Sequence, residues 1–330
     1  MDVDAYSARH RQLWTRLDVL SRKRRLSGAE ADELVLLYRR TSQQLARLQT
    51  HSPEPELVAG LSAVVARARG RIVGSSPDTW AEIVRFFTHG FPGAVYRALG
   101  WWLGVAVAFL SVAAGFATWV SVDDSARESL GLQGDTGALT APGGAFETYY
   151  TEHSNDAFAA MVWTNNAWVS ALALFLGVLI LPVLYLLFMN ALNIGVTAGL
   201  MADAGRLESF FGFLLPHGML ELTAIFIAGG AGLKLGWTLI DPGRMSRAEA
   251  VAHQGRHTAA IALGLVPTLL VAGLLEGFVT PSALPTPARI ACGLIAEAAF
   301  LAYIFTAGRR ANRTDAVAAH ETAPVRMIAI

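Results

Sequence analysis

The chain has 330 residues, of which 53% are hydrophobic and only 16% are charged, and its mean hydropathy is +0.42. Soluble domains carry roughly a quarter charged residues, so this composition excludes an ordinary soluble protein and predicts one that is partly solvated by lipid. The 26 basic and 26 acidic residues cancel. A single cysteine, Cys292, excludes an intrachain disulfide. The first residues lack the apolar run of a signal peptide, so we expect the N-terminus to stay in the cytoplasm.

Residues 1–75 predict a cytoplasmic helical module. Apolar residues recur there with helical spacing in three stripes. The stripes are Leu13, Leu17 and Leu20; Leu34, Leu37, Tyr38, Thr41, Leu45 and Leu48; and Leu57, Leu61, Val64, Val65 and Ile72. Ser27 and Glu30 have the spacing of a capping box at the start of the second helix, and Pro53 and Pro55 separate the second helix from the third. These features predict three antiparallel helices.

Residues 76–97 predict an amphipathic helix that lies in the headgroup layer. Ser76 to Asp78 have the pattern of a helix start. The apolar face holds Trp80, Ile83, Val84 and Phe87. Further upstream, the basic run from Arg22 to Arg25 could bind anionic lipid or nucleic acid, but such a run is more often the solvated end of a helix. We therefore expect no nucleic-acid partner.

The first membrane span is predicted over Leu99 to Val120. Its 22 uncharged residues, at about 1.5 Å per residue, cross a hydrocarbon core of roughly 30 Å. An outer segment, residues 121–165, follows with seven acidic residues and one basic residue, Arg127, and the positive-inside rule places it outside the cell. We expect an aromatic stripe in this segment to rest on the outer leaflet. The stripe consists of Phe146, Tyr149, Tyr150, His153, Ala157 and Phe158.

An uncharged run of 46 residues lies between Asp156 and Asp203. It is too long for one helix at any ordinary tilt, so we predict two crossings with a turn near Leu181 and Pro182. A broken or re-entrant element around Asn190 and Asn193 is the alternative.

Three more spans complete the predicted transmembrane bundle, residues 98–310. They cover Phe211 to Ile240, Thr258 to Thr280 and Ala288 to Gly308. With six spans, the basic residues near 244–256 and 309–313 lie on the cytoplasmic side, whereas with five they would lie outside. The positive-inside rule therefore favours six spans with both termini, including the tail 311–330, in the cytoplasm. The predicted fold class is an all-α, polytopic helical bundle.

Ionisable and amide side chains inside the spans predict an intramembrane polar cluster, because such groups are costly in lipid and need partners. Its members are His217, Glu221, Glu276, Glu297, Asn166, Asn190 and Asn193. His217 and Glu221 are four residues apart and share a helix face. In the six-span arrangement the cluster lies mainly in the outer half of the membrane.

A second pattern on the same span predicts helix packing. Small residues recur every four positions at Ala224, Ala228, Gly232 and Gly236, which lets a neighbouring backbone approach closely. This helix-packing ridge is suited to contacts within one chain and to contacts between chains, so the sequence is compatible with both a monomer and an oligomer. The neighbouring run from Gly229 to Lys234 lacks the Gly-Lys-Ser/Thr order of a phosphate loop, which argues against a nucleotide site.

The stretch LPHGMLELTAIFIA, Leu215 to Ala228, resembles the signature of the stage II sporulation protein M family of bacterial membrane proteins. Further similar stretches are TNNAW at Thr164 to Trp168, FMNALNIG at Phe188 to Gly195, LLEGFVTP at Leu274 to Pro281, and the LYRR segment at Leu37 to Arg40. His217, Glu221 and Glu276 match the family pattern, whereas Glu297 is selected on physical grounds alone. The resemblance implies a multi-pass protein of the bacterial cytoplasmic membrane that holds other membrane or envelope proteins, with peptidoglycan-degrading enzymes among the implied partners.

Three functions are compatible with these residues. A non-enzymatic scaffold of a cell-envelope complex is favoured, with the polar cluster fixing helix register. A small-solute or ion transporter would use the same cluster as a mid-membrane site. An intramembrane metal-dependent hydrolase is the third, since a histidine and carboxylates can hold a metal that activates water. The H-E-x-x-H and G-x-S-x-G motifs are absent, so we expect no catalytic residue, no metal and no cofactor.

Overall fold

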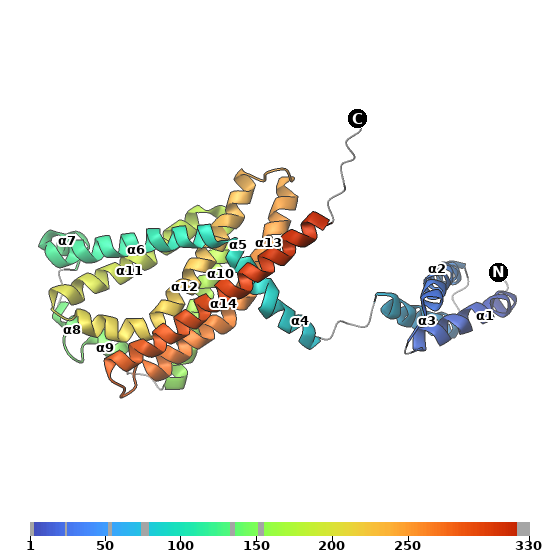
Figure 1. The fold of residues 1–330 in the computed structure, drawn as a ribbon, viewed down its shortest axis with the longest axis horizontal. Coiled ribbons are helices and arrows are strands. Elements are labelled where there is room, and N and C mark those ends of the chain that lie inside the picture. Colours follow the sequence, from blue (N-terminus) through green and yellow to red (C-terminus); the bar gives the residue numbers. More distant parts are fainter. Residues whose placement is uncertain are drawn as a thin grey trace. The chain divides into compact units, whose positions relative to one another are not determined.

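The computed structural model describes residues 3–23, 25–51, 55–73, 79–132, 136–150 and 155–321. No strand occurs among these residues, which confirms the predicted all-α class. The chain divides into two compact units, Met1–Val84 and Arg85–Ile330, and each unit is considered by itself (Figure 1). Pro53, the predicted helix start at Ser76 to Asp78, and His153 of the aromatic stripe lie outside the described residues.

Three helices form the N-terminal unit: α1 (Val3–Arg22), α2 (Gly28–His51) and α3 (Pro55–Val73). Each packs against the other two because each carries one of the predicted apolar stripes. The buried core residues are Trp14, Leu17, Leu20, Leu34, Leu37, Leu48, Leu61 and Ala68. Burial of each large side chain contributes roughly 1.5 to 3 kcal/mol. The exposed pair Arg16–Glu33, with an N–O distance of 2.7 Å, contributes less.

The predicted capping box at the start of α2 is present. The Glu30 amide donates to the Ser27 hydroxyl at 3.3 Å, and the Ser27 amide donates to the Glu30 carboxylate at 3.0 Å. The Lys23 ammonium also donates to Glu30 at 2.6 Å. The hydrogen bond from Lys23 and that from the Ser27 backbone together lower the pKa of Glu30 to about 2. The carboxylate therefore stays charged where the helix begins.

The predicted headgroup helix over residues 76–97 is not one helix. The structure has α4 (Thr79–Arg85), a π turn η1 (Phe86–Gly90) and α5 (Phe91–Arg97). Pro92 lacks an amide hydrogen, which favours a break in the regular ladder at this point. Neither α4 nor η1 has a buried residue, whereas Phe91 and Val95 of α5 are buried within the bundle. The second half of the predicted helix, α5, therefore belongs to the core of the bundle, because its apolar face packs against neighbouring helices.

Six helices are long and apolar enough to cross a membrane. Three spans are single helices: Leu99–Val122 (α6), Leu181–Asp203 (α11) and Leu207–Ile240 (α12). Two spans combine a helix with the turn that follows it: Asp156–Leu179 lies in α10 (Asn155–Phe175) and the turn η2 (Leu176–Leu179), and Arg247–Val279 consists of α13 (Arg247–Leu274) and the π turn η3 (Leu275–Val279). The last span, Thr286–Val317, lies within α14 (Thr286–Glu321). The count agrees with the prediction of six.

The uncharged run of 46 residues crosses twice, as predicted. A tight turn ends at Ile180, whose φ of 57° is a left-handed conformation that a β-branched residue rarely adopts. Pro182 then stands in the first turn of α11, where a missing amide hydrogen costs nothing. From Leu181 to Asp203 α11 is one unbroken helix, so the alternative of a broken element around Asn190 is wrong.

At the centre of the bundle lies α12, which contacts α6, α10, α11, α13 and α14. Of its most apolar stretch 61% is buried, the highest share among the six spans. The closest neighbouring pair is α6 and α11, which run side by side in Figure 1. Gly195 and Gly199 of α11 meet the α6 backbone, since a methyl group at Gly195 would lie 2.5 Å from the Ala113 carbonyl oxygen. These glycines allow the close approach.

The outer segment is folded onto the bundle by two arginines. It contains α7 (Asp124–Ser129), α8 (Thr136–Thr140) and α9 (Ala145–Tyr149). Arg127 makes a two-pronged ion pair with Asp203 at 2.8 and 2.9 Å. Arg206 donates to the Thr140 carbonyl at 2.9 Å and pairs with Glu147. Both arginines therefore attach the segment to the turn between α11 and α12.

The aromatic stripe of the outer segment packs on protein and does not lie on the leaflet as predicted. Tyr150 and Phe158 are buried, and the Tyr150 ring stacks on Phe213 of α12 with a centroid distance of 5.2 Å. Phe146 stacks on Phe210 of the same helix at 5.7 Å. Aromatic pairs of this kind gain from shape and ring electrostatics beyond the area they bury. The stripe is therefore a cap over α12.

The predicted tail, residues 311–330, begins as helix, because α14 continues to Glu321. Asp315 on this extension accepts a hydrogen bond from Arg97 of α5 at 2.9 Å and contacts His89 of η1 at 2.9 Å. Where α5 meets α14, a methyl group at Gly308 would lie 2.5 Å from the Pro92 carbonyl oxygen. The polar contacts hold α5 against α14 next to this close backbone approach.

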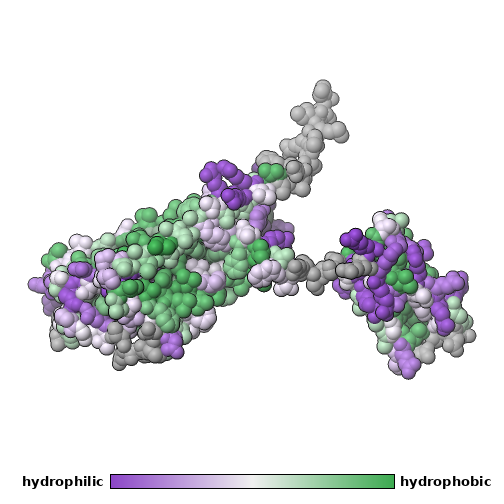
Figure 2. Space-filling view, turned by 60° about the horizontal axis from the view of Figure 1, so that its bottom comes forward, coloured by the Kyte–Doolittle hydropathy of each residue, from purple (hydrophilic) through white to green (hydrophobic). Residues whose placement is uncertain are grey.

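The two units differ in the surface that they expose. Figure 2 shows hydrophobic residues over much of the visible face of the bundle, whereas the N-terminal unit is mostly hydrophilic in that view. Large apolar side chains in the spans are exposed, among them Val107 at 67% and Phe175 at 79%. Apolar surface of this extent is stable in lipid and unstable in water.

Candidate functional site

Two neighbouring elements bring three of the predicted polar residues together. His217 and Glu221 lie one turn apart on α12, and Glu276 lies in the π turn η3 that follows α13. One ligand atom from each of the three residues lies within 4.8 Å of the others. His217 is 4% exposed and Glu276 is 3% exposed, whereas Glu221 is partly exposed. This trio, His217, Glu221 and Glu276, is the core of the predicted cluster.

The backbone explains how Glu276 reaches α12. In a π turn the amide bonds to the carbonyl five residues earlier, and the Thr280 amide donates to the Leu275 carbonyl at 3.0 Å in this way. The wider turn changes the direction of the side chains compared with a regular helix. Such single π turns are frequent at functional sites.

Within the trio, His217 Nε2 lies 3.7 Å from Glu276 Oε1. That distance is too long for a direct hydrogen bond. The second oxygen of Glu276, Oε2, is buried and has no hydrogen-bond partner. An unpartnered buried carboxylate oxygen is costly, so the trio is incomplete with its protein atoms alone.

Thr280 orients the histidine. Its hydroxyl donates to the Leu275 carbonyl at 3.3 Å and lies 3.2 Å from His217 Nδ1. When the hydroxyl donates to Leu275, its oxygen accepts from Nδ1–H of His217. In the neutral ring the lone pair is then on Nε2, which points toward Glu276.

The aromatic cap covers this end of the trio. The Tyr150 ring centroid lies 6.0 Å from that of His217. Burial, with the charge of Glu276 nearby, raises the pKa of Tyr150 far above its ordinary range, so the phenol stays protonated. The cap excludes water from His217 and contributes no negative charge.

Glu297 does not join the trio. It comes from α14 and accepts a hydrogen bond from Thr223 of α12 at 2.8 Å. Thr223 lies two residues after Glu221 and therefore on a different face of the helix. Glu297 links α12 to α14 at a separate place.

The three predicted asparagines also lie apart from the trio. Asn190 donates to the Leu186 carbonyl at 2.8 Å within its own helix. Asn166 contacts its neighbour Asn165 at 3.4 Å, and Asn193 is exposed. Within the described residues none of them hydrogen-bonds to the trio.

The helix-packing ridge is used inside the chain. Ala224 and Ala228 are fully buried. A methyl group at Gly232 would overlap the Ala173 carbonyl of α10, and one at Gly236 would lie 2.7 Å from Ile180. The ridge thus receives the end of α10 and the turn η2.

Lys234, at the end of the glycine-rich run, caps a helix. Its ammonium donates to the Arg97 carbonyl at the end of α5, at 2.8 Å, where a cation complements the helix dipole. This role is compatible with the sequence argument against a nucleotide site.

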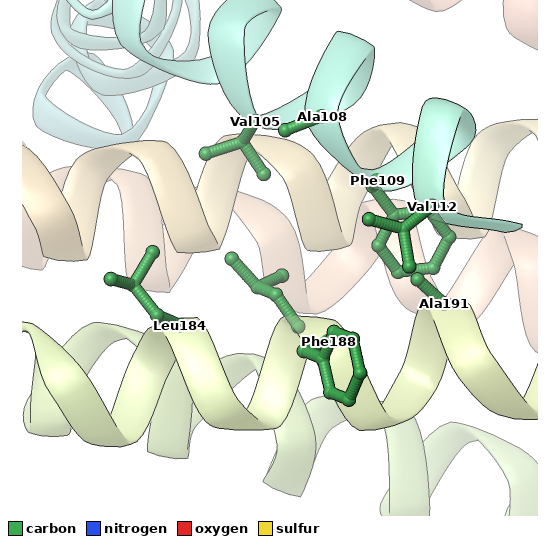
Figure 3. Close-up of a pocket in the computed structure, with 8 residues that line it drawn as sticks. Val105, Ala108, Phe109, Val112, Leu184, Phe188 and Ala191 are labelled. Atoms are coloured by element: carbon green, nitrogen blue, oxygen red, sulfur yellow. The ribbon is translucent and has the colours of Figure 1, made fainter. Parts of the chain in front are cut away.

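Two cavities of the bundle have linings that do not include the trio. Figure 3 shows one between α6 and α11, of about 130 Å³, which is lined by carbon atoms of residues such as Val105 and Phe188. Another, of about 570 Å³, lies over Leu220 between α13 and α14. Neither is lined by a member of the trio.

Sequence reasoning missed Thr280 and Tyr150 as neighbours of His217. Thr280 stands four residues after Glu276 in LLEGFVTP, a helical spacing that would have placed both side chains on one face. Tyr150 belonged to the predicted aromatic stripe, but no sequence signal placed that stripe over α12.

The fold and the trio define a polytopic helical membrane protein with a closed polar site inside its bundle. Residues 99–281 match the family model of stage II sporulation protein M. This match covers more than half of the chain, so the protein belongs to that family, as the resemblance indicated. Residues 4–74 match a domain of unknown function, DUF8413. No curated protein and no solved structure matches the chain.

Proposed function

We propose that this protein is a non-enzymatic membrane scaffold that holds other proteins of a cell-envelope complex. The supporting observation is the burial of the trio under an aromatic cap: His217 and Glu276 are almost fully buried, and Glu221 is partly exposed. A transport site must open to one side of the membrane, and a hydrolase must admit its substrate. Buried polar pairs that fix how helices pack suit a scaffold.

The transporter alternative has less support. A broken element near Asn190 would have suited a half-helix that points its dipole at a substrate, but α11 is continuous there. The cavities of about 130 and 570 Å³ have apolar linings that do not include a member of the trio. We therefore do not propose transport.

The proposed partners bind outside the hydrocarbon region. The N-terminal unit exposes large apolar side chains, Val19 at 51% and Leu36 at 57%, and the outer segment exposes Glu128. Partners include the lipid bilayer and other envelope proteins, with peptidoglycan-active enzymes as the class implied by the family.

Photo-crosslinking in native membranes tests the scaffold. A benzophenone amino acid replaces Leu36 or Glu128, and Val107, 67% exposed in a span, is the matched control position. We expect discrete protein adducts from Leu36, Glu128 or both, and lipid adducts alone from Val107. Two results would contradict the proposal. One is metal-dependent turnover by the purified protein that Glu221→Gln abolishes, and the other is solute flux in liposomes that the same substitution abolishes.

We also propose that the protein lies in the bacterial cytoplasmic membrane with both termini in the cytoplasm. Arg244 and Arg247 flank the turn between α12 and α13, and the positive-inside rule supports a cytoplasmic position for this turn. In a Cys292→Ser background, Ser129→Cys should react with an impermeant maleimide in spheroplasts, whereas Met245→Cys should react only after lysis. The opposite pattern would invert the topology.

A further inference from the structure

We propose that His217, Glu221 and Glu276 form a binding site for a divalent transition-metal ion of the zinc class, which ties α12 to the π turn η3. This inference does not rest on the scaffold role, and it replaces the expectation from sequence that the chain holds no metal. It is carried by the arrangement of the three side chains and by the unpartnered oxygen of Glu276.

The first argument is charge. Two carboxylates and one imidazole lie within 4.8 Å of one another in a buried site between helices. Two negative charges at that separation repel strongly where the dielectric constant is low. A divalent cation balances both carboxylates and leaves the histidine neutral, so the loaded site has no net charge. Within the described residues neither carboxylate forms an ion pair with a lysine or arginine.

The second argument is the orientation of His217. With the Thr280 hydroxyl donating to Leu275, its oxygen receives the Nδ1 hydrogen of His217, and the lone pair of Nε2 then faces Glu276. A lone pair that faces a carboxylate oxygen at 3.7 Å is repelled unless a positive species lies between the two atoms. Histidines that bind metals characteristically donate their other N–H to an oxygen acceptor, and Thr280 fills that position.

The third argument is distance. Zinc bonds of about 2.0 to 2.2 Å in tetrahedral geometry separate two ligand atoms by about 3.3 to 3.6 Å. The separation of His217 Nε2 and Glu276 Oε1, 3.7 Å, is close to that range. The widest separation in the trio, at most 4.8 Å, requires a contraction of about 1 Å. Rotation of the Glu221 side chain, which is partly exposed, supplies this movement.

A shared proton explains the site less well. A proton between His217 and Glu276 needs a short hydrogen bond, whereas the observed 3.7 Å is too long. Moreover, Glu276 Oε2 would still lack a partner. With a metal, both oxygens of Glu276 lie next to the ion, and His217, Glu221 and Glu276 supply three ligand groups.

The donor set indicates the class of metal. Imidazole nitrogen suits zinc, copper, iron and nickel, whereas sites made only of oxygen suit magnesium and calcium. One nitrogen with carboxylate oxygens therefore favours zinc over the larger hard cations. Because the aromatic cap covers the site and the ion would tie α12 to η3, we assign the ion a structural role.

Metal analysis of the full chain tests the proposal. The protein is purified in mild detergent without chelator, its affinity tag is removed, and zinc is measured by mass spectrometry after equilibration with zinc and removal of the excess. We expect about one zinc ion per chain. His217→Ala and Glu276→Gln should each reduce this content at least about tenfold.

Glu297→Gln is the matched control, because Glu297 is also an intramembrane glutamate that contacts α12, but it comes from α14 and accepts a hydrogen bond from Thr223. This variant should keep the zinc content of the wild type. Thr280→Val should weaken zinc affinity by about 10- to 100-fold, and Thr280→Ser should restore it. Restoration by serine separates orientation of His217 from a general packing defect.

Two results would overturn the proposal. One is wild-type protein that is monodisperse and helical yet holds less than about a tenth of a zinc ion per chain after loading. The other is Glu276→Gln that retains the wild-type content. If His217→Ala or Glu276→Gln does not fold, the test uses the wild-type protein alone. Removal of zinc by a chelator must then lower its melting temperature, and addition of zinc must restore the original melting temperature. Absence of that shift also overturns the proposal.

Discussion

Substitution of alanine for Gly232 should destabilise the bundle, because this position has no room for a side chain. A methyl group there would overlap the Ala173 carbonyl of α10 and lie 3.3 Å from the Cα atom of Gly177. Both obstacles are backbone atoms, which cannot rotate away, so the end of α10 and the turn η2 must move off α12. Overpacking of this kind costs about 1 to 3 kcal/mol, whereas alanine returns roughly 1 kcal/mol of helix propensity.

The matched control is Gly104→Ala in α6, where a methyl group meets nothing within 4 Å. Both variants gain the same propensity, so the difference between their free energies of unfolding measures the overlap alone, about 1 to 3 kcal/mol. Steric-trap or denaturant unfolding in bicelles measures this difference. Equal stabilities for Gly232→Ala and Gly104→Ala would refute the assignment of the ridge to contacts within the chain.

Three further substitutions test other parts of the structure. Arg206→Gln removes the bonds to Thr140 and Glu147 and should speed proteolysis within residues 136–150, with unchanged cleavage counting against the anchor. Phe158→Ala, at a side chain that is 2% exposed, should cost about 3 to 5 kcal/mol of bundle stability, and a loss below about 1 kcal/mol would contradict the aromatic cap. The pKa of Glu30 in the folded chain, about 2, is below its ordinary value of 4.5. The ionised Glu30 carboxylate therefore stabilises the folded chain fully above pH 4.5, and this stabilisation is lost as the pH falls toward 2. Glu30→Gln should remove this part of the pH dependence of hydrogen exchange in α2, and an unaltered pH profile would show that the capping box does not contribute it.

Spans and helices could be predicted because they depend on local pattern. A run of uncharged residues about as long as the bilayer is thick has few alternatives to a crossing helix. The double crossing between Asp156 and Asp203 followed from the length of the uncharged run and from the positions of the basic residues, and the structure places the turn at Ile180, beside the predicted Leu181 and Pro182. The capping box of Ser27 and Glu30 is local too, since three residues separate the partners.

Contacts between distant residues were harder to predict. His217 and Glu221 share a face by spacing, but no pattern showed that Glu276 meets them and that Glu297 does not. Glu276 and Glu297 both lie within predicted spans, where an ionisable side chain has a similar free-energy cost. The residues that each one contacts depend on the direction in which its side chain leaves the helix. The π turn η3 changes that direction for Glu276, and a single sequence does not reveal such a turn.

The same reasoning explains why the aromatic stripe and the second half of the 76–97 segment were misplaced. Tyr150, Phe158 and Phe91 are apolar enough for either lipid or protein, so periodicity cannot distinguish a leaflet from a neighbouring helix. In the structure these side chains pack on other helices. Tyr150 stacks on Phe213, and Phe91 lies over Gly264, which has no side chain to block the contact.

The sequence by itself determined that this protein is an all-α membrane protein with six spans, and its motifs indicated the stage II sporulation protein M family. Those properties depend on composition, length and spacing, which are local. The tertiary structure alone decided that His217, Glu221 and Glu276 meet under an aromatic cap while Glu297 and the asparagines stay apart. The reason is physical: helix packing depends on where small residues let backbones approach, and that depends on all six helices at once.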